Sequence, residues 1–566
     1  MKSLAPAALV LLVASCAICR AVEVNDVPSG LTQTEVTGWE DELRQAGATV
    51  VELKSFEQRL RDMSSAECAL TASMFQRAPS KFIREYLVDL RRGYELDALE
   101  PTPKPLYPGA APVCTCDSLH YISIPNTTID SVTIDSTQGW CRVVATVTNP
   151  PASDHIKIYV ALPTKGWNGR FLGTGGGGFA GGSPTNLRAQ AARGFAVAAT
   201  DTGHAGLDGS FALDQNKRLD WQSIEDFAYL GIHEMTMVGK ALVEAFYGRV
   251  PGRSYFIGGS TGGRQALMEA QRYPGDYNGI VAAAPAIYFN HLKFAQLWPQ
   301  MVMLDADHFI PEAKLTAATA AAVESWRKTR HTSDEFIDDP RQFGFDAKSL
   351  VGTIVQDSVF TAADAEVIDQ IWQGPRGRDG RFLWYGLQRG ADLKFLAGTG
   401  GTPIHGEPYP MAIDWCQFFL AKNRAWKWTS INRSEFERLL AQSIEEFSPV
   451  IETADPNLTE YRDRGGKLII WHGWADQFIP PEGSIVYYQQ IARRMGGPQE
   501  TSKFARLFMA PGVGHCGGGS GPQPFALIAA IIRWTEEGTP PDKLAGEMFD
   551  TNGVARCSRP LSSFVE

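Results

Sequence analysis

The stretch that most constrains the fold of this chain is residues 255–266, which read YFIGGSTGGRQA. Aromatic and β-branched residues typical of a strand run into GGSTG at 258–262, and an amphipathic pattern typical of a helix follows directly. Glycine at positions 258 and 262 lets strand and helix approach closely, because glycine has no Cβ. We therefore predict a strand, a tight turn and a helix, with the Ser260 hydroxyl raised above the sheet. The spacing G-x-S-x-G is that of a turn presenting a nucleophilic serine, although plain strand-to-helix turns also match it.

The segments around this turn alternate between strand and helix patterns. Strands are predicted at 155–162, 170–173, 195–200, 279–286, 467–471 and 504–509, and helical patterns occupy 223–247 and 524–537. Such alternation is typical of a parallel α/β sheet. It fades between 287 and 456, where helices and loops rich in Trp, Phe and Tyr predict a large insertion into a single sheet.

Two residues in the last third of the chain complete a candidate catalytic set with Ser260. A serine hydroxyl needs a base to accept its proton and an acid to orient that base, and α/β-hydrolases carry them in the order Ser, Asp/Glu, His. Asp476 follows the strand pattern KLIIW and His515 follows FARLFM, so each lies at the carboxyl end of a predicted strand. His472 precedes Asp476 in the same loop, which gives the wrong order, and we interpret it as structural.

The segment GTGGGGFAGG, which begins at Gly173, supplies candidate donors for a tetrahedral oxyanion. One backbone N–H is expected from Thr261, the residue after the candidate nucleophile. The other is expected from the loop that contains Gly176, Gly177 and Gly178 and follows an early strand. A phosphate-binding loop is the alternative interpretation, but the Lys-Ser/Thr ending of a P-loop is missing.

Charge and composition argue against several other classes of protein. The formal net charge of −10, with no long Lys/Arg cluster, argues against nucleic acid as a partner. An apolar fraction of 44% and a charged fraction of 20% are typical of a globular chain. The sequence contains no H-E-x-x-H motif and no CxxC pair, which argues against a zinc hydrolase.

Residues 1–21 predict a cleaved export signal. Lys2 precedes an apolar run at 4–13, and small residues follow it. No later stretch approaches about 20 apolar residues, so no membrane span is expected. Cys16, preceded by Val-Ala-Ser, also fits a lipoprotein processing site, which would make the exported protein lipid-anchored instead.

A helical arm with a linker is predicted for 22–115, because Leu53, Phe56 and Leu60 recur at helical spacing and a proline-rich segment begins at Pro101. Beyond the signal the cysteines are odd in number, so an exported chain should hold disulfides and at least one unpaired thiol. These cysteines are Cys68, Cys114, Cys116, Cys141, Cys416, Cys516 and Cys557.

Ordered blocks of this sequence resemble the tannase and feruloyl esterase family of α/β-hydrolases, which includes a bacterial enzyme that cleaves the monoester released from poly(ethylene terephthalate). The blocks are WNGRFLGTGGGGFAGG from 167, GFAVAATDTGH from 194, HEMTMVGKALVEAFYG from 233, YFIGGSTGGRQALMEAQRYPGDYNGIVAAAPA from 255 and DPNLTEYRDRGGKLIIWHGWADQFIPP from 455. The resemblance covers roughly residues 116–561. It implies an α/β-hydrolase domain at 116–286 and 457–566, a lid at 287–456 that shapes an aromatic-acid pocket, and the triad Ser260, Asp476 and His515.

One departure from the family concerns a disulfide. The family typically has a cysteine directly before the nucleophile, linked to a cysteine directly after the catalytic histidine. This chain has Gly259 at the first position and Cys516 at the second. We therefore expect Cys516 to be a free thiol near the active site, and Cys114 or Cys116 to bridge to Cys141.

A second departure concerns calcium, which the family's lid usually holds through aspartates preceding an I-D-D-P segment. Of the three earlier aspartate positions only Asp334 remains, and Arg327 and Arg330 occupy the other two. Calcium takes six to eight oxygen ligands and is repelled by a neighbouring cation. We therefore expect no calcium and no other cofactor, with Arg327 or Arg330 paired to Asp334 instead.

Together these features predict a secreted serine carboxylic ester hydrolase that acts on a small-molecule substrate, an ester of a hydroxylated aromatic acid of the feruloyl or galloyl type. The alternative is a non-catalytic binding protein with a hydrolase fold. The two departures favour that alternative, and the complete triad argues against it. A serine-directed phosphonate separates the two, because only a working triad reacts quickly.

Overall fold

The computed structural model describes residues 31–45, 47–49, 52–54, 56–57, 60, 100–135, 139–550, 552 and 554–565. Contacts divide the chain into two compact units, Met1–Leu87 and Val88–Glu566. The first unit contains helix α2 (Gln33–Gln45), which buries Val36, Trp39 and Leu43 at helical spacing. The predicted export signal, including Cys16, lies outside the described residues.

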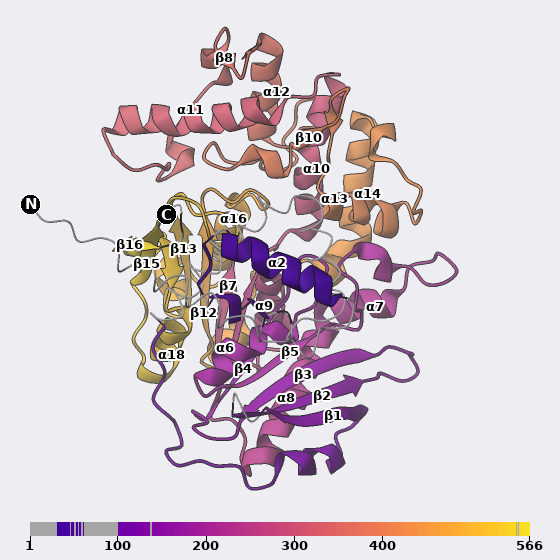
Figure 1. Ribbon diagram of the computed structural model, residues 1–566, viewed down its shortest axis with the longest axis vertical. Helices are drawn as coiled ribbons and strands as arrows, with labels where there is room; N and C mark the ends of the chain where they lie inside the picture. Colours follow the sequence, from indigo (N-terminus) through magenta and orange to yellow (C-terminus); the bar gives the residue numbers. More distant parts are fainter. Residues whose placement is uncertain are drawn as a thin grey trace, which may run out of the picture. The chain divides into compact units, whose positions relative to one another are not determined.

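The second unit is built on a nine-stranded sheet of order β1-β2-β3-β5-β4-β6-β7-β12-β13 (Figure 1). Neighbouring strands from β5 to β13 are parallel, whereas β1, β2 and β3 form an antiparallel extension that joins β5. The strands are β1 (Thr127–Asp135), β2 (Trp140–Val147), β3 (Ile156–Pro163), β4 (Arg170–Thr174), β5 (Ala196–Thr200), β6 (Arg253–Gly259), β7 (Gly279–Ala283), β12 (Lys467–Gly473) and β13 (Ala505–Ala510). The predicted α/β-hydrolase fold is thereby confirmed.

Helices cover both faces of this sheet, and the strands are correspondingly apolar on both sides. In β5, Ala196 and Ala198 pack in one core cluster, while Val197 and Ala199 pack in the other. The first face is covered by α8 (Gly231–Tyr247), α9 (Thr261–Arg272) and α16 (Glu482–Arg494), and the second by α6 (Leu187–Ala192) and α18 (Leu527–Glu537). Every residue of β4, β5 and β7 is buried, as expected for parallel strands between two helical layers.

Residues 287–456 form a largely helical insertion, the expected lid, drawn from pink to orange in Figure 1, whose apolar core also includes Phe179 and Phe227 from before β6. Its helices are α10 (Phe289–Asp305), α11 (Glu312–Arg330), α12 (Ala362–Gln373), α13 (Pro410–Asp414) and α14 (Arg433–Ile451), and its strand pairs are β8 (Ile354–Val355) with β9 (Ser358–Val359) and β10 (Thr399–Gly400) with β11 (His405–Gly406). The two ends of the lid meet where Thr453 N–H donates a hydrogen bond of 3.1 Å to the Ile287 carbonyl. The lid therefore leaves and rejoins the sheet at one place.

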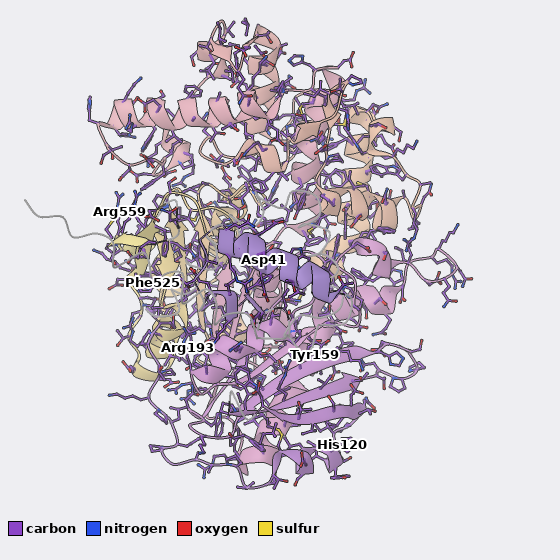
Figure 2. All side chains as sticks on the ribbon, viewed as in Figure 1. Asp41, His120, Tyr159, Arg193, Phe525 and Arg559 are labelled. Carbon is purple, nitrogen blue, oxygen red and sulfur yellow. A yellow bond between two sulfur atoms is a disulfide. The ribbon has the colours of Figure 1, made fainter. Side chains whose placement is uncertain are left out.

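A small sheet follows β13 near the C-terminus, formed by β14 (Gln523–Phe525), β15 (Lys543–Phe549), β16 (Ala555–Ser558) and β17 (Leu561–Ser562). Arg559 lies on the loop between its last two strands (Figure 2). At the other end of the unit a disulfide joins Cys116 to Cys141, which confirms the predicted bridge to Cys141 and selects Cys116 as the partner. No helix in the described part of the chain combines the length and apolarity needed to cross a bilayer.

Candidate active site

Ser260 lies at the junction of β6 and α9, in the predicted strand–turn–helix. Its backbone adopts φ 60° and ψ −121°, a conformation that residues with a Cβ rarely adopt. Two hydrogen bonds hold this turn: Ser260 N–H donates to Ala283 O at 2.9 Å, and Ala286 N–H donates to Ser260 O at 3.2 Å. The N–H and the C=O of Ser260 are therefore both held by hydrogen bonds, one to β7 and one to the segment after it.

The glycines around Ser260 are required by close contacts between backbones. A Cβ on Gly258 would lie 2.4 Å from the Gly262 carbonyl oxygen, and a Cβ on Gly262 would lie 2.9 Å from the Gly176 carbonyl oxygen. Both distances are too short for any side chain to occupy. The close approach of strand and helix that the sequence predicts is present, and the glycine-rich loop also lies against the turn.

Asp476 and His515 lie together in the loops that follow β12 and β13. His515 Nδ1 is 2.7 Å from Asp476 Oδ2, while the other carboxylate oxygen accepts hydrogen bonds of 2.8 Å from the backbone N–H groups of Phe478 and Ile479. Burial alone would raise the pKa of Asp476, but the charge on His515 and hydrogen bonds from His472 and His515 hold it well below its usual range. Asp476 is therefore a buried carboxylate that accepts hydrogen bonds on both of its oxygens.

His472 is a second histidine on the same carboxylate. Its Nε2 lies 3.0 Å from Asp476 Oδ2 and its Nδ1 lies 2.8 Å from Ser484 Oγ, and the side chain is fully buried. The expectation of a structural role for His472 fits these contacts, but the sequence did not indicate that it would share an oxygen with His515. The sequence feature that could have indicated this contact is the position of His472 near the end of β12, beside the loop that carries Asp476.

His515 is held on three sides. Its backbone N–H donates to Gln477 Oε1 at 3.1 Å, the Phe478 ring lies edge-on with centroids 5.4 Å apart, and its Nε2 is 3.8 Å from Cys516 Sγ. Burial alone would lower the pKa of His515, but the Asp476 carboxylate and the Cys516 sulfur outweigh burial and raise that pKa well above its usual value. An imidazolium formed at His515 is accordingly stabilised.

The hydrogen-bond network of the described residues joins Asp476 to His515 and does not include Ser260 Oγ. In free hydrolases this contact is often long and shortens when a substrate binds. The structure thus brings the candidate acid and base into direct contact and places the candidate nucleophile on the adjoining turn.

The glycine-rich loop packs against the first turn of α9, and this corrects one predicted donor. Gly176 N–H donates to Gln265 Oε1 at 2.9 Å, so it is already used and we withdraw it from the oxyanion site. No hydrogen bond from the N–H of Gly177, Gly178 or Thr261 to another described residue is present. A Cβ on Gly177 would meet no atom within 4 Å, so this position faces open space.

Gln265 holds the glycine-rich loop beside the candidate site, which the sequence analysis did not predict. Its Oε1 accepts from Gly176 and its Nε2 donates to Gly181 O at 2.9 Å, so one amide group fixes both arms of the loop. Thr261 Oγ1 adds a hydrogen bond of 2.6 Å to Gly178 O. Gln265 follows Thr261 by four residues and therefore lies on the same face of α9. This spacing is the sequence feature that could have indicated its contact with the loop.

Lid residues contact the catalytic loops. The rings of Phe395 and Tyr409 lie 5.1 Å and 5.0 Å from the ring of Phe478, which in turn contacts His515. Burial, assisted by the charge of Asp476, raises the pKa of Tyr409 to about 12, so its hydroxyl keeps its proton. The lid thus contributes aromatic side chains to the surroundings of the base.

The region expected to have lost calcium contains a different ion pair from the one predicted. Asp334 Oδ2 is 2.7 Å from Arg559 Nη1, whereas Arg327 pairs with Glu324 and Arg330 lies over the Trp326 ring. The predicted pairing of Asp334 with Arg327 or Arg330 is therefore wrong. Within the described ranges, no group of three or more His, Cys, Asp or Glu is arranged to hold a metal ion.

Cys516 is a free thiol in this structure, together with Cys114, Cys416 and Cys557. We expect a bulky maleimide that reaches Cys516 to inhibit hydrolysis by displacing the His515 ring, whose Nε2 lies 3.8 Å from the sulfur. Time-dependent loss of activity, with peptide mapping under non-reducing conditions, measures this. Finding Cys516 in a disulfide with another cysteine would refute the prediction.

Two variants control this experiment. Cys516→Ser should resist the maleimide because it lacks the thiol. Gly259→Cys should resist it by forming a disulfide, because a Cβ at position 259 would lie 3.5 Å from the Cys516 Cβ and 2.7 Å from its sulfur. Inhibition of Cys516→Ser at the wild-type rate would show that a different thiol is responsible.

Comparison with known proteins gives consistent results. The family pattern described as tannase and feruloyl esterase matches residues 141–564. A probable feruloyl esterase of Arthroderma benhamiae is 35% identical over 447 residues, covering 76% of this chain and 81% of the relative. An uncharacterised esterase of Xanthomonas campestris is 32% identical over 524 residues, covering 81% and 88% of the two chains.

The fold is also similar to that of solved structures. The crystal structure of feruloyl esterase B from Aspergillus oryzae aligns with a TM-score of 0.70 at 27% identity, over 79% of this chain and 95% of that one. A tannin acyl hydrolase from Aspergillus niger aligns with a TM-score of 0.71 at 22% identity, over 83% and 91%, and supports the fold alone.

Proposed function

The chain belongs to the tannase and feruloyl esterase family of carboxylic ester hydrolases, and from this premise we propose that Ser260, Asp476 and His515 hydrolyse esters of hydroxylated aromatic acids through an acyl-enzyme. The observation that carries the proposal is the hydrogen bond of 2.7 Å between His515 Nδ1 and Asp476 Oδ2, beside the strained Ser260 turn. Membership of the family makes the chain a carboxylic ester hydrolase, and the assignment of roles to these residues is our inference.

The geometry supports a definite order of proton transfers. A carboxylate only accepts hydrogen bonds, so neutral His515 carries its one proton on Nδ1 and can take the proton of Ser260 at Nε2. The serine oxygen then attacks the ester carbonyl, and His515 returns the proton to the departing alcohol. Water repeats the sequence on the acyl-enzyme and releases the acid.

The developing oxyanion is assigned to the backbone N–H groups of Thr261 and Gly177. Thr261 is the first residue of α9, so its N–H has no acceptor within the helix and benefits from the positive end of the helix dipole. Gly177 faces open space next to Gly176, whose N–H is held by Gln265. Loss of one such donor typically lowers turnover by about 10² to 10³.

The substrate class rests on the lid and on the relatives. Phe395 and Tyr409 of the lid contact the ring of Phe478, which contacts His515, and this aromatic cluster favours an aromatic acyl group. The family description names tannase and feruloyl esterase, and a relative from Aspergillus niger carries the name feruloyl esterase B. We extend that class of acid, of the feruloyl or galloyl type, to this chain.

A panel of galloyl, feruloyl, 4-coumaroyl and acetyl esters tests the proposal. The expected result is hydrolysis of one or more aromatic esters with a kcat/KM well above that for the acetyl ester. A serine-directed phosphonate should label Ser260 and stop turnover. Binding of the esters without turnover or labelling would instead support the non-catalytic alternative.

Export is also proposed. The disulfide between Cys116 and Cys141 persists in oxidising compartments and is uncommon in the cytosol. Together with the signal-like residues 1–21, it supports secretion over retention in the cell.

We further propose that stability and activity do not depend on calcium. Arg559 places a guanidinium 2.7 Å from Asp334 and 3.9 Å from Asp338, and this charge repels a divalent cation from the position that the family uses. We expect a chelator to leave the melting temperature and kcat unchanged. A fall in melting temperature with chelator that added calcium reverses would contradict this.

Arg559→Met provides the control for the ion pair itself. Arg559 is 44% exposed, so solvent screens the pair and its loss should reduce the free energy of unfolding by about 1 kcal/mol or less. A much larger loss would show that the guanidinium has a structural role beyond neutralising the two aspartates.

A further inference from the structure

Lys293 is a buried lysine in the lid that forms no ion pair with any residue that the structure describes. It lies on the second turn of α10 and is 2% exposed. Its ammonium group has three N–H donors, and among the described residues its one acceptor is Gln296 Oε1 at 3.4 Å. Lysine is almost never fully buried unless it is paired, because removing an unpaired charge from water is unfavourable.

Aromatic rings surround the Lys293 amine. Nζ lies 4.3 Å from the centroid of the Phe289 ring and 5.3 Å from that of Phe179. The Arg264 guanidinium lies over the same Phe289 ring at 5.7 Å, and it too forms no ion pair with a described carboxylate. Burial, opposed by Asp414 and assisted by Arg264, lowers the pKa of Lys293 to about 7.

Lys314, another buried lysine of the lid, has the ion pair that is typical of a structural role. Lys314 on α11 is also buried, but its Nζ lies 2.7 Å from Asp364 Oδ2, and Asp364 accepts further hydrogen bonds from Thr361. The burial of the Lys314 charge is thus explained by its ion pair with Asp364. Lys293 has no carboxylate partner among the described residues, and a buried ionisable group without one is a candidate for binding a ligand.

One line of contacts links Lys293 to the nucleophile. Thr261, which follows Ser260, donates through its hydroxyl to Gly178 O at 2.6 Å. Phe179 is the next residue of that loop, and its ring faces the Lys293 amine. Lys293 therefore lies behind the loop that we assign to the oxyanion.

A second line of contacts links Lys293 to the base. Phe478 contacts His515 through its ring and accepts a hydrogen bond of 3.3 Å from Gln296 Nε2 through its carbonyl. The other end of the same Gln296 amide accepts from Lys293. Contacts therefore link Lys293 both to the turn of Ser260, through Phe179, and to the loop of His515, through Gln296.

We propose that Lys293 binds the phenolic oxygen at the far end of the acyl ring and so selects esters of hydroxylated aromatic acids. The proposal rests on the proposed function and deepens it by naming the residue that recognises the hydroxyl. A phenol both donates and accepts, so it forms a hydrogen bond with the ammonium or with the neutral amine. Phe179 and Phe289 supply apolar surface for the ring that carries the hydroxyl.

Lys293→Met tests this with Lys314→Met as the matched control. The measured quantity is the ratio of kcat/KM for methyl 4-hydroxycinnamate to kcat/KM for methyl cinnamate. We expect Lys293→Met to lower that ratio about tenfold or more, because the hydroxyl loses its partner. Lys314→Met should leave the ratio unchanged and lower the melting temperature, because the buried Asp364 carboxylate loses its lysine partner.

The melting temperature separates recognition from a merely structural role. Methionine at position 293 removes an unpaired buried charge at similar volume, so Lys293→Met should melt no lower than the wild type. An unchanged ratio, or equal losses for both esters together with a lower melting temperature, would overturn the proposal.

Binding to the Ser260→Ala variant provides a readout that does not need turnover. Calorimetry should show tighter binding of 4-hydroxycinnamate than of cinnamate, and Lys293→Met in the same background should abolish that preference. If this preference is present while the wild type hydrolyses no aromatic ester, the proposed function fails and the role of Lys293 stands. If the preference survives in Lys293→Met, or is absent with Lys293 in place, the role of Lys293 is refuted.

Discussion

Ser260→Ala and His515→Ala are each expected to lose ester hydrolysis by a factor on the order of 10⁴ or more. Alanine at position 260 removes the attacking oxygen. Alanine at position 515 removes the group that takes and returns its proton. Because the triad acts as a unit, the double variant should be little slower than either single one.

Initial rates on a feruloyl ester, together with melting temperatures, measure this. Neither substitution removes a hydrogen bond that holds the Ser260 turn, because the turn is held by backbone groups, so the Ser260 variant should keep the wild-type melting temperature. His120→Ala, on the exposed residue labelled in Figure 2, is the control and should keep full activity. A rate above about a tenth of wild type in either variant would refute the assignment.

Asp476→Asn should lower kcat by a similarly large factor, about 10⁴, although it only replaces one carboxylate oxygen by an amide NH2 group. The backbone N–H groups of Phe478 and Ile479 donate to Oδ1, which fixes the amide oxygen at that position. The amide nitrogen then faces His515 Nδ1 and donates to it. His515 must accept there and carry its proton on Nε2, where it cannot take the proton of Ser260.

This prediction is checked by kcat alongside NMR of the imidazole nitrogens, which reports the tautomer. Asp334→Asn is the control, because it removes a carboxylate that pairs with Arg559 and does not contact the triad. Activity retained in Asp476→Asn with the proton on Nδ1 would contradict the proposed geometry.

Local features of the fold were predictable from the sequence because each depended on neighbouring residues. The strand, turn and helix around Ser260 follow from apolar patterning and from glycines at 258 and 262, whose close contacts are present. Asp476 and His515 were expected together because carboxyl ends of parallel strands meet at one edge of a sheet, and β12 and β13 are neighbours.

Contacts between distant side chains were not predictable, because no local pattern encodes them. Gly176 donates to Gln265, which lies 89 positions along the chain, and this removed one expected oxyanion donor. Asp334 pairs with Arg559 across 225 positions, where nearer arginines were expected. The sharing of Asp476 by His472 likewise depends on how the loop folds back.

The meeting of the lid's two ends has an evolutionary consequence. Thr453 and Ile287 are hydrogen-bonded, so residues 287–453 form a loop that is closed at the edge of the sheet. The entropy of closing such a loop grows only with the logarithm of its length, about 0.6 kcal/mol for each doubling. Relatives can therefore carry lids of different length between these two positions without a change in the pairing of β7 with β12.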